Sequence, residues 1–272
     1  MNEPAPILTF LSDYGLTDDF VGVCHGVIAG ICPAARVIDL THGIRRHNVR
    51  AGAVVLAEAL AYLPVGVHLA VVDPDVGAER RAVALGCADG RVLVGPDNGL
   101  LVPAAEQAGG IVAAADIARS SFRLEPVSAT FHGRDLFAPV AAALANGVTV
   151  PEVGDPLDPA ELVALELPRA RFADGTLIAH VRYVDGFGNV QLNAGHEDLA
   201  DTGLKLGRVA LVELDGDRAL AAQYARTFAD VARGDLLLYE DAARRLSVAV
   251  SHGDAADRLG VDIDDELRIR PE

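Results

Sequence analysis

"ILTFLSDYGLTDDFVGVCHGVIAGICPAARVIDL" (residues 7–40) places two short aliphatic runs, 7–11 and 35–40, on either side of a longer run at 20–31. The short runs have the length and composition of buried strands, and the longer run has the length and apolar spacing of a helix. Strand, helix and strand in this order are typical of a βαβ unit, in which a helix covers a parallel sheet. This stretch therefore predicts an α/β fold.

The same alternation continues beyond this unit. A helical pattern covers 48–63 and a strand pattern covers 67–73, and both extend the βαβ series. Further strands are expected at AVALGCA (82–88), RVLVG (91–95) and IVAAADI (111–117), and further helices at 100–109 and at about 133–146. We predict that residues 1–160 form an α/β N-terminal domain with a mostly parallel sheet covered by helices.

The second part of the chain has a different pattern of predicted strands and helices. A proline-bearing, acid-rich connection ends in a segment, 161–171, that we interpret as a linker. Beyond it, strand patterns separated by Gly/Asp turns, with little helix between them, predict a smaller, mainly antiparallel and barrel-like β domain at 172–272. These strands are TLIAHVRYV (176–184), RVALVEL (208–214), DLLLYED (235–241) and RLSVAVS (245–251).

Composition excludes several classes of function. The 272 residues carry a formal net charge of −16 and no basic stripe interleaved with aromatic residues, so we expect no nucleic-acid partner. No apolar run approaches the roughly 20 residues of a membrane span, and MNEPAPILTF lacks the features of a signal peptide, so we expect no membrane association and a cytoplasmic location.

The chain also lacks the usual signatures of cofactor and metal sites. Its three cysteines follow no zinc-binding spacing, so we expect neither a disulfide framework nor a metal site. Gly22, Gly26 and Gly30 recur every fourth residue, which lets a helix pack closely on a sheet. Without a Gly-x-Gly-x-x-Gly turn, no nucleotide cofactor is predicted.

Four polar clusters follow predicted strands or open a helix. Each alone has an ordinary explanation: Asp13 and Asp18 as helix caps, Asp97 in a turn, His132 as a satisfied histidine, and 73–81 as a solvated turn. In open parallel sheets, however, ligands bind outside the carboxyl ends of the strands, and these clusters are expected to meet there. The clusters are SDYGLTDDF (12–20), DPDVGAERR (73–81), GPDNGLL (95–101) and TFHGRDLFAP (130–139).

Six motifs, in this order and spacing, resemble the S-adenosylmethionine (SAM) hydroxide adenosyltransferase family, relatives of fluorinase and chlorinase. The resemblance covers nearly the whole chain. It implies hydrolysis of SAM to adenosine and methionine, with no cofactor, by water attacking ribose C5′. It also implies a homotrimer whose active sites lie between the N-terminal domain of one subunit and the C-terminal domain of the next. The motifs are SDYGLTDDFVGVCHGVIAGICP, DLTHGIRRHNVRAGA, VVDPDVGAERRAVAL, VGPDNGLL, SATFHGRDLFAPVAA and YVDGFGNVQLN.

The resemblance also implies roles for individual residues. The family's catalytic Asp/Arg/His trio falls on Asp73, Arg80 and His132, and Asp13 matches the acid that holds the ribose hydroxyls. The remaining expected substrate-binding residues are His47, Asp185, Phe187 and Asn189, with backbone contacts at Val250 and His252.

This chain departs from the family pattern at several positions. Asp75 stands where the family usually has Gly, and adds a negative charge beside the expected base. The segment 242–245, Ala-Ala-Arg-Arg, replaces a Ser-Gly turn, which leaves an arginine as a possible partner of the methionine carboxylate. Leu192-Asn193 replaces Thr-Asn, and Ser251-His252-Gly253 replaces Asn-x-Gly.

Two alternatives remain open at this point. A halide-using relative would also cleave SAM, but its anion pocket would have to accept an aspartate at 73. A non-catalytic SAM or adenosine sensor would keep Asp13 and Asn189 without needing Asp73, Arg80 and His132.

Overall fold

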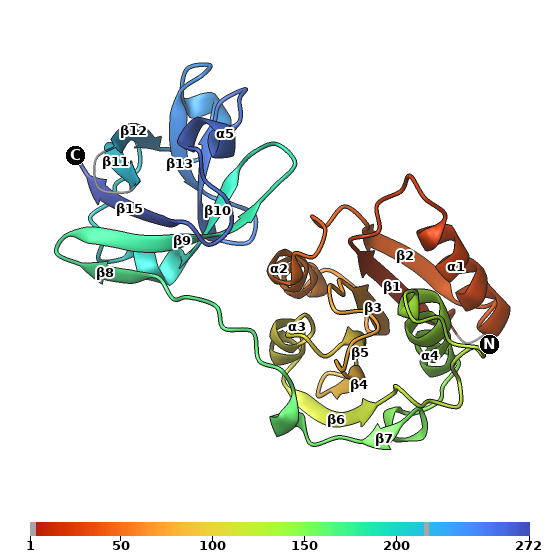
Figure 1. The fold of residues 1–272 in the computed structure, drawn as a ribbon. Coiled ribbons are helices and arrows are strands. Elements are labelled where there is room, and N and C mark those ends of the chain that lie inside the picture. Colours follow the sequence, from red (N-terminus) through yellow and green to blue (C-terminus); the bar gives the residue numbers. More distant parts are fainter. Residues whose placement is uncertain (1–3, 215–217) are drawn as a thin grey trace. The chain divides into compact units, whose positions relative to one another are not determined.

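The computed structural model describes residues 4–214 and 218–272, so the first three residues of the predicted N-terminal domain lie outside the described residues. The chain divides into two compact units, Met1–Leu165 and Glu166–Glu272, which are labelled by element in Figure 1. Within the described residues, no helix combines the length and the hydropathy needed to cross a membrane.

The first unit is built on a seven-stranded sheet in the order β2-β1-β3-β5-β4-β6-β7. β2, β1, β3 and β5 pair in parallel, and β4, β6 and β7 continue the sheet antiparallel. The predicted α/β domain with a mostly parallel, helix-covered sheet is confirmed. The strands are β1 (Ile7–Ser12), β2 (Arg36–Thr41), β3 (Val67–Val71), β4 (Ala82–Cys87), β5 (Val92–Pro96), β6 (Ile111–Asp116) and β7 (Asp155–Pro156).

Helices cover both faces of this sheet, with α1 and α4 on one side and α2 and α3 on the other (Figure 1). Cys24 and Ile28 of α1 and Val140 of α4 are fully buried against Phe10 and Leu69 of the sheet. Burying apolar side chains on both faces explains why the central strands β1 and β3 are almost uninterrupted runs of apolar residues. The helices are α1 (Phe20–Ile31), α2 (Val49–Leu60), α3 (Val102–Gln107) and α4 (Ala138–Ala145), with 3₁₀ turns η2 (Val150–Glu152) and η3 (Pro159–Glu161).

The register of the parallel strands determines where the site forms. Ser12 at the end of β1 pairs with Val71 at the end of β3. The residues that follow both strands therefore emerge side by side at the carboxyl edge of the sheet. A π-helical segment, η1 (Gly133–Phe137), runs directly into α4. The fourth polar cluster, 130–139, includes this segment and so lies in the same unit as the other three.

The second unit is a barrel of seven strands. The order β10-β14-β13-β12-β11-β15-β9 closes on itself because β9 also pairs with β10, and β8 adds to β9 from outside the ring. All pairings except β12–β13 are antiparallel, which confirms the predicted barrel-like β domain. Its elements are β8 (Arg171–Ala173), β9 (Thr176–Val184), β10 (Val190–Gly195), η4 (His196–Leu199), β11 (Val209–Leu214), β12 (Arg218–Tyr224), η5 (Phe228–Asp230), β13 (Leu236–Glu240), β14 (Arg245–Val250), α5 (Ala255–Leu259) and β15 (Glu266–Pro271).

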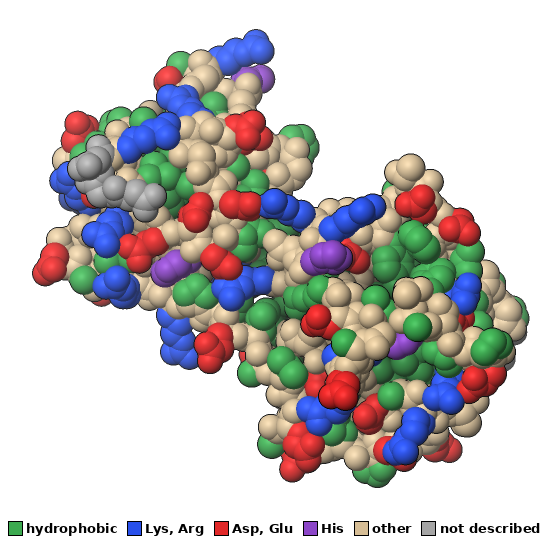
Figure 2. Space-filling model, viewed as in Figure 1, with side chains coloured by type: hydrophobic (Ala, Val, Ile, Leu, Met, Phe, Trp, Pro, Cys, Tyr) green, Lys and Arg blue, Asp and Glu red, His purple; other side chains and the backbone are tan. Residues whose placement is uncertain are grey.

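Charged side chains of both signs are interspersed over each unit on the face shown in Figure 2. Exposed ion pairs occur among the described residues, for example Arg119–Asp155 at 2.8 Å. Such exposed pairs contribute little to stability, typically below about 1 kcal/mol. The fold is therefore held mainly by the two apolar cores.

Candidate active site

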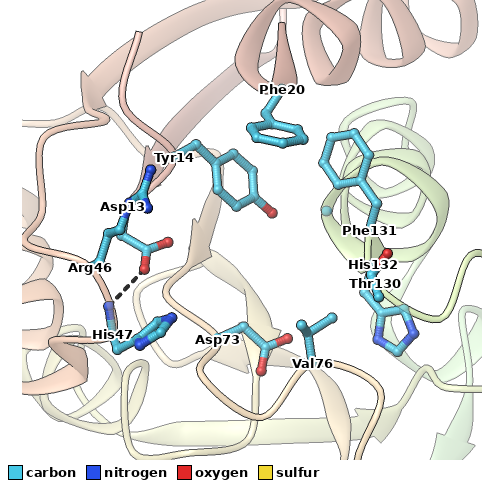
Figure 3. Close-up of a pocket in the computed structure, with 11 residues that line it drawn as sticks. Asp13, Tyr14, Phe20, Arg46, His47, Asp73, Val76, Thr130, Phe131 and His132 are labelled. Carbon is cyan, nitrogen blue, oxygen red and sulfur yellow. Dashed lines mark hydrogen bonds between the residues drawn. The ribbon is translucent and has the colours of Figure 1, made fainter. Parts of the chain in front are cut away.

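A pocket of about 300 Å³ opens at the carboxyl edge of the parallel strands (Figure 3). This volume lies at the lower end of the range of small-molecule sites. The lining residues come from the loops after β1, β2 and β3, from the start of α1, and from the segment that leads into and begins η1. They are Asp13, Tyr14, Phe20, Arg46, His47, Asp73, Val76, Thr130, Phe131, His132 and Gly133.

Asp73 and Arg80 form the most tightly held pair in this site. The Arg80 Nε–H donates to both carboxylate oxygens of Asp73, at 2.9 Å to Oδ1 and 3.0 Å to Oδ2, and Nη2 also donates to Oδ2. The two side chains are only 6% and 9% exposed, so water screens this interaction weakly. The planar fork of the guanidinium fixes the orientation of the carboxylate.

The turn between these two residues explains the charged end of β3. Gly77 adopts a φ of 83°, which a residue with a side chain rarely adopts, and a Cβ there would collide with the carbonyl oxygen of Ala129. The backbone N–H of Ala78 closes the turn by donating to the Asp75 carbonyl at 3.0 Å. The chain thus reverses within a few residues and returns Arg80 to Asp73.

His132 extends this pair into a chain of three side chains. Arg80 Nη2 lies 2.8 Å from His132 Nδ1, and a guanidinium can only donate, so Nδ1 accepts and the ring proton is on Nε2. Burial, reinforced by the positive charge of Arg80, lowers the pKa of His132 below its usual value. The imidazole is therefore neutral at neutral pH, which this hydrogen bond requires.

Tyr14 places a hydroxyl inside the pocket, opposite Asp73 (Figure 3). Burial is the main reason that the pKa of Tyr14 is raised well above its usual value, so the phenol stays protonated and can donate. A Cβ on Gly133 would collide with this hydroxyl, so a larger residue there would displace it. Phe20 and Phe131 pack edge to face, with ring centroids 5.1 Å apart, and give this side of the pocket an apolar wall.

Asp13 and His47 lie on the other side of the pocket. Asp13 Oδ2 accepts the backbone N–H of His47 at 2.9 Å, which joins the loop after β1 to the loop after β2. His47 adopts a φ of 65°, in the left-handed region that side chains rarely occupy. Local strain of this kind often accompanies binding sites, where the surrounding structure holds the residue in place.

The fourth predicted cluster supports the pocket without lining it. Asn98 donates from its side-chain amide to the carbonyl of Val72 at 2.8 Å, directly beside Asp73. Asp97 is buried and pairs with Arg81 Nε at 2.9 Å, and it also accepts the backbone N–H of Val163. These contacts hold the carboxyl ends of β3 and β5 together.

The predicted substrate-binding residues of the C-terminal domain gather at one end of the barrel. Asp185 Oδ1 accepts the backbone N–H groups of Phe187 and Asn189, at 2.8 and 2.9 Å, and Oδ2 accepts the Asn189 side chain at 2.7 Å. The Phe187 ring is 82% exposed. The carbonyl of Gly188 accepts the backbone N–H of Ala255, so this turn packs on the loop that carries His252.

Several lining residues were not predicted from the sequence. Tyr14 and Phe131 are neighbours of predicted residues within the same motifs, and their position next to Asp13 and His132 is the signal that could have identified them. Arg46 lies beside His47, and Val76 lies in the turn between Asp73 and Arg80. Neither residue belongs to a sequence pattern that would distinguish it as a pocket residue.

Both parts of the chain match family models. Residues 8–154 match the model described as "SAM hydroxide adenosyltransferase N-terminal domain", and residues 179–268 match the corresponding C-terminal domain.

Known proteins resemble the chain over nearly its whole length. A Salinispora tropica protein named (R)-S-adenosyl-L-methionine hydrolase is 48% identical over 98% of this chain and 98% of its own length. A Thermus thermophilus protein of the same name is 38% identical, covering 93% and 94%. A fluorinase from an Actinoplanes species is 30% identical over 90% of each chain. The crystal structure of an uncharacterized conserved protein from Thermotoga maritima superimposes with a TM-score of 0.89, at 36% identity over 97% of this chain and 99% of that one.

Proposed function

The chain belongs to the SAM hydroxide adenosyltransferase family, and from this premise we propose that its pocket hydrolyses SAM to adenosine and methionine. The observation that supports the proposal is the hydrogen-bonded chain of Asp73, Arg80 and His132, in which Asp73 and His132 line the pocket and Arg80 joins them. Relatives at 47–48% identity over nearly the full chain are named for this reaction. No cofactor is required, because SAM itself carries the leaving group.

The leaving group and the attacking water need different degrees of assistance from the enzyme. As water oxygen bonds to ribose C5′, the C5′–S bond breaks and its electron pair stays on sulfur, so methionine leaves as a neutral thioether without needing a proton. Water is a weak nucleophile and must lose a proton as it attacks. The enzyme therefore needs a hydrogen-bond acceptor beside the water, and general-base assistance of this kind contributes about 10²–10⁴-fold.

Asp73 is the acceptor that this geometry favours. Its Oδ2 receives two N–H contacts from Arg80, whereas Oδ1 receives one at 2.9 Å and keeps lone-pair capacity for a water molecule. The proton released by the water passes to Asp73 and then to solvent.

Arg80 and His132 act as positioning residues in this proposal. Arg80 fixes the Asp73 carboxylate, and the neutral His132 fixes Arg80, leaving the His132 Nε2–H as a donor at the pocket wall. Holding water, C5′ and sulfur in one line can lower the activation free energy by an amount on the order of 7–11 kcal/mol. A rigid arrangement of these side chains therefore contributes as much to the rate as polarisation of the water.

Substrate binding is assigned to the surrounding residues. Asp13 has a carboxylate available for the ribose hydroxyls, and His47 lies beside it on the pocket wall. We propose that the substrate is the (R)-sulfonium epimer of SAM, which is the form in the names of the hydrolase relatives. Comparing consumption of the two separated epimers tests this assignment, and preferential loss of the (S) epimer would contradict it.

We further propose a homotrimer in which Asp185, Phe187, Asn189, Val250 and His252 of one subunit bind substrate at the pocket of the next. Support comes from the exposed Phe187 ring and from the gathering of these residues at one end of the barrel. Analytical ultracentrifugation of the active enzyme should show a trimer, and a fully active monomer would contradict it. The cytoplasmic location remains a prediction from the sequence.

The halide-using alternative is disfavoured by charge. A halide placed beside C5′ would face the Asp73 carboxylate, and a buried anion pair without a compensating cation is strongly unfavourable. The single positive charge of Arg80 is already balanced by Asp73, so a halide would add an unbalanced negative charge to the site.

Product analysis separates the candidate functions. The purified enzyme, incubated with SAM in buffer containing chloride, should yield adenosine and methionine in equal amounts by chromatography. A 5′-halo-adenosine product would instead indicate a halogenase, and binding of SAM without product would indicate a sensor.

A further inference from the structure

A second cluster of potential ligands lies outside the pocket, between α1 and the edge strand β2. His25 comes from α1, Asp39 from β2, and His42 from the loop that follows β2. His25 Nε2 lies 2.8 Å from Asp39 Oδ1, and His42 Nε2 lies 3.1 Å from the same oxygen. All three atoms lie within 4.8 Å of one another.

The buried member of this cluster has an unsatisfied nitrogen. His42 is 4% exposed, and its Nε2 makes no hydrogen bond to any residue that the structure describes. The 3.1 Å approach to Asp39 is therefore an electrostatic contact without hydrogen-bond alignment. Burying a polar atom without a partner is unfavourable, and in native proteins such an atom is normally satisfied by an ordered water or an ion.

The other ring nitrogen of His42 is held as it is in metal-binding histidines. Nδ1 lies 2.7 Å from Ser12 Oγ, which also accepts the backbone N–H of Tyr14 at 3.3 Å. With the proton on Nδ1, donated to Ser12, the lone pair of Nε2 faces His25 and Asp39. Histidine ligands usually donate their second N–H in this way, which fixes the tautomer that binds the metal.

We propose that His25, Asp39 and His42 bind a divalent transition-metal ion, with Zn²⁺ the best match. Two imidazole nitrogens and one carboxylate oxygen are a donor set that Zn²⁺ uses, with a fourth position open to water. Zinc–ligand distances imply ligand atoms about 3.3 Å apart in a tetrahedral site. The two separations at the Asp39 oxygen, 2.8 and 3.1 Å, would lengthen by up to about half an ångström, and the two histidine nitrogens, which lie within 4.8 Å of each other, would settle near the same distance. The His25 and Asp39 side chains are 35% and 41% exposed, which allows this adjustment and admits the ion from solvent.

The ion would act on the catalytic pocket indirectly. Ser12 immediately precedes Asp13, and the backbone N–H of Gly15 donates to the carbonyl of His42 at 2.8 Å. Fixing His42 therefore fixes the loop that carries Asp13 and Tyr14. No metal site is predicted from the sequence, because these ligands are spread over a helix, a strand and a loop without a recognised spacing.

Calorimetric titration of the metal-free full-length protein with ZnCl₂ tests the proposal. We expect one ion per chain, and at least about tenfold weaker binding in each of the variants His25→Gln and Asp39→Asn. Both positions are partly exposed, so the variants should keep the fold, which circular dichroism checks. His196→Gln is the matched control, because His196 pairs with Glu240 at 2.7 Å on the surface outside the proposed cluster.

Two further readouts make the outcome decisive. Zn²⁺ should raise the thermal midpoint of the wild-type protein and leave that of His25→Gln unchanged. Co²⁺ substituted for Zn²⁺ should give the intense visible absorption of a four-coordinate site. Absence of Zn²⁺ binding, or binding that both variants retain, would overturn the proposal.

Discussion

Replacing Asp73 by asparagine separates the activation of water from the binding of substrate. The substitution keeps the size of the side chain but leaves one oxygen where the carboxylate has two. Arg80 donates to both oxygens of Asp73, so the new amide NH₂ must face either Arg80 or the pocket. In the first orientation two donors oppose each other, and in the second a donor replaces the acceptor that the water needs.

The expected loss follows from this geometry. With no acceptor for the water proton, kcat should fall by roughly 10²-fold or more, within the 10²–10⁴-fold range of general-base assistance. This corresponds to about 2.7–5.4 kcal/mol of transition-state stabilisation. The contacts expected to hold the ribose, at Asp13, are unchanged, so the affinity for SAM should stay close to that of the wild type.

The assay measures the initial rate of adenosine formation by chromatography and the affinity for SAM by calorimetry. Asp75→Asn is the matched control, since it removes the same charge from an exposed residue of the same turn. Its turnover should stay close to that of the wild type. Near-normal turnover of Asp73→Asn, or an equal loss in Asp75→Asn, would refute the role assigned to Asp73.

Three further predictions concern the pocket and the core. Asp13→Ala should weaken adenosine binding by roughly 1.5–3 kcal/mol, because the ribose hydroxyls lose a charged acceptor; unchanged affinity in calorimetry would count against the assignment. Gly133→Ala should lower kcat/KM, because the new methyl group displaces the Tyr14 hydroxyl, and wild-type kinetics would show that this approach is unimportant. Burial lowers the pKa of His68 to about 4, from 6.5 for an ordinary histidine, so the unfolded chain binds this proton first as the pH falls. The free energy of unfolding should therefore decrease by up to about 3 kcal/mol between about pH 6.5 and pH 4, and His68→Asn should remove this part of the urea-measured pH dependence.

The βαβ series of the first unit could be predicted from the sequence because its central strands, β1 and β3, are buried on both faces. Runs such as 7–11 and 67–73 are then almost wholly apolar, and the helices between them have a clear helical period. The antiparallel pairing of β4 with β5 and β6 could not be predicted, because a buried strand has the same composition in either direction. The closure of the barrel depends on β9 pairing with β10, a contact that local patterns do not encode.

Some contacts of the candidate site could be predicted from the sequence, and others could not. Asp13 and Asp73 follow strands that emerge at one edge, so strand order alone places them together. The link from Arg80 to His132 joins residues 52 positions apart through one hydrogen bond, and only the family resemblance pointed to it. The His25–Asp39–His42 cluster gave no signal in the sequence, because its geometry arises from the packing of α1 on β2.

Hydrolysis of SAM in ¹⁸O-labelled water tests the central claim most directly, namely that water held by Asp73 attacks ribose C5′. Attack at carbon places the incoming oxygen on the 5′-hydroxyl, and the sulfur of methionine never gains oxygen. Mass spectrometry should therefore find the label in adenosine and none in methionine, at a rate that falls in parallel with turnover in Asp73→Asn. Unlabelled adenosine, or labelled adenosine formed at the wild-type rate by Asp73→Asn, would contradict the account.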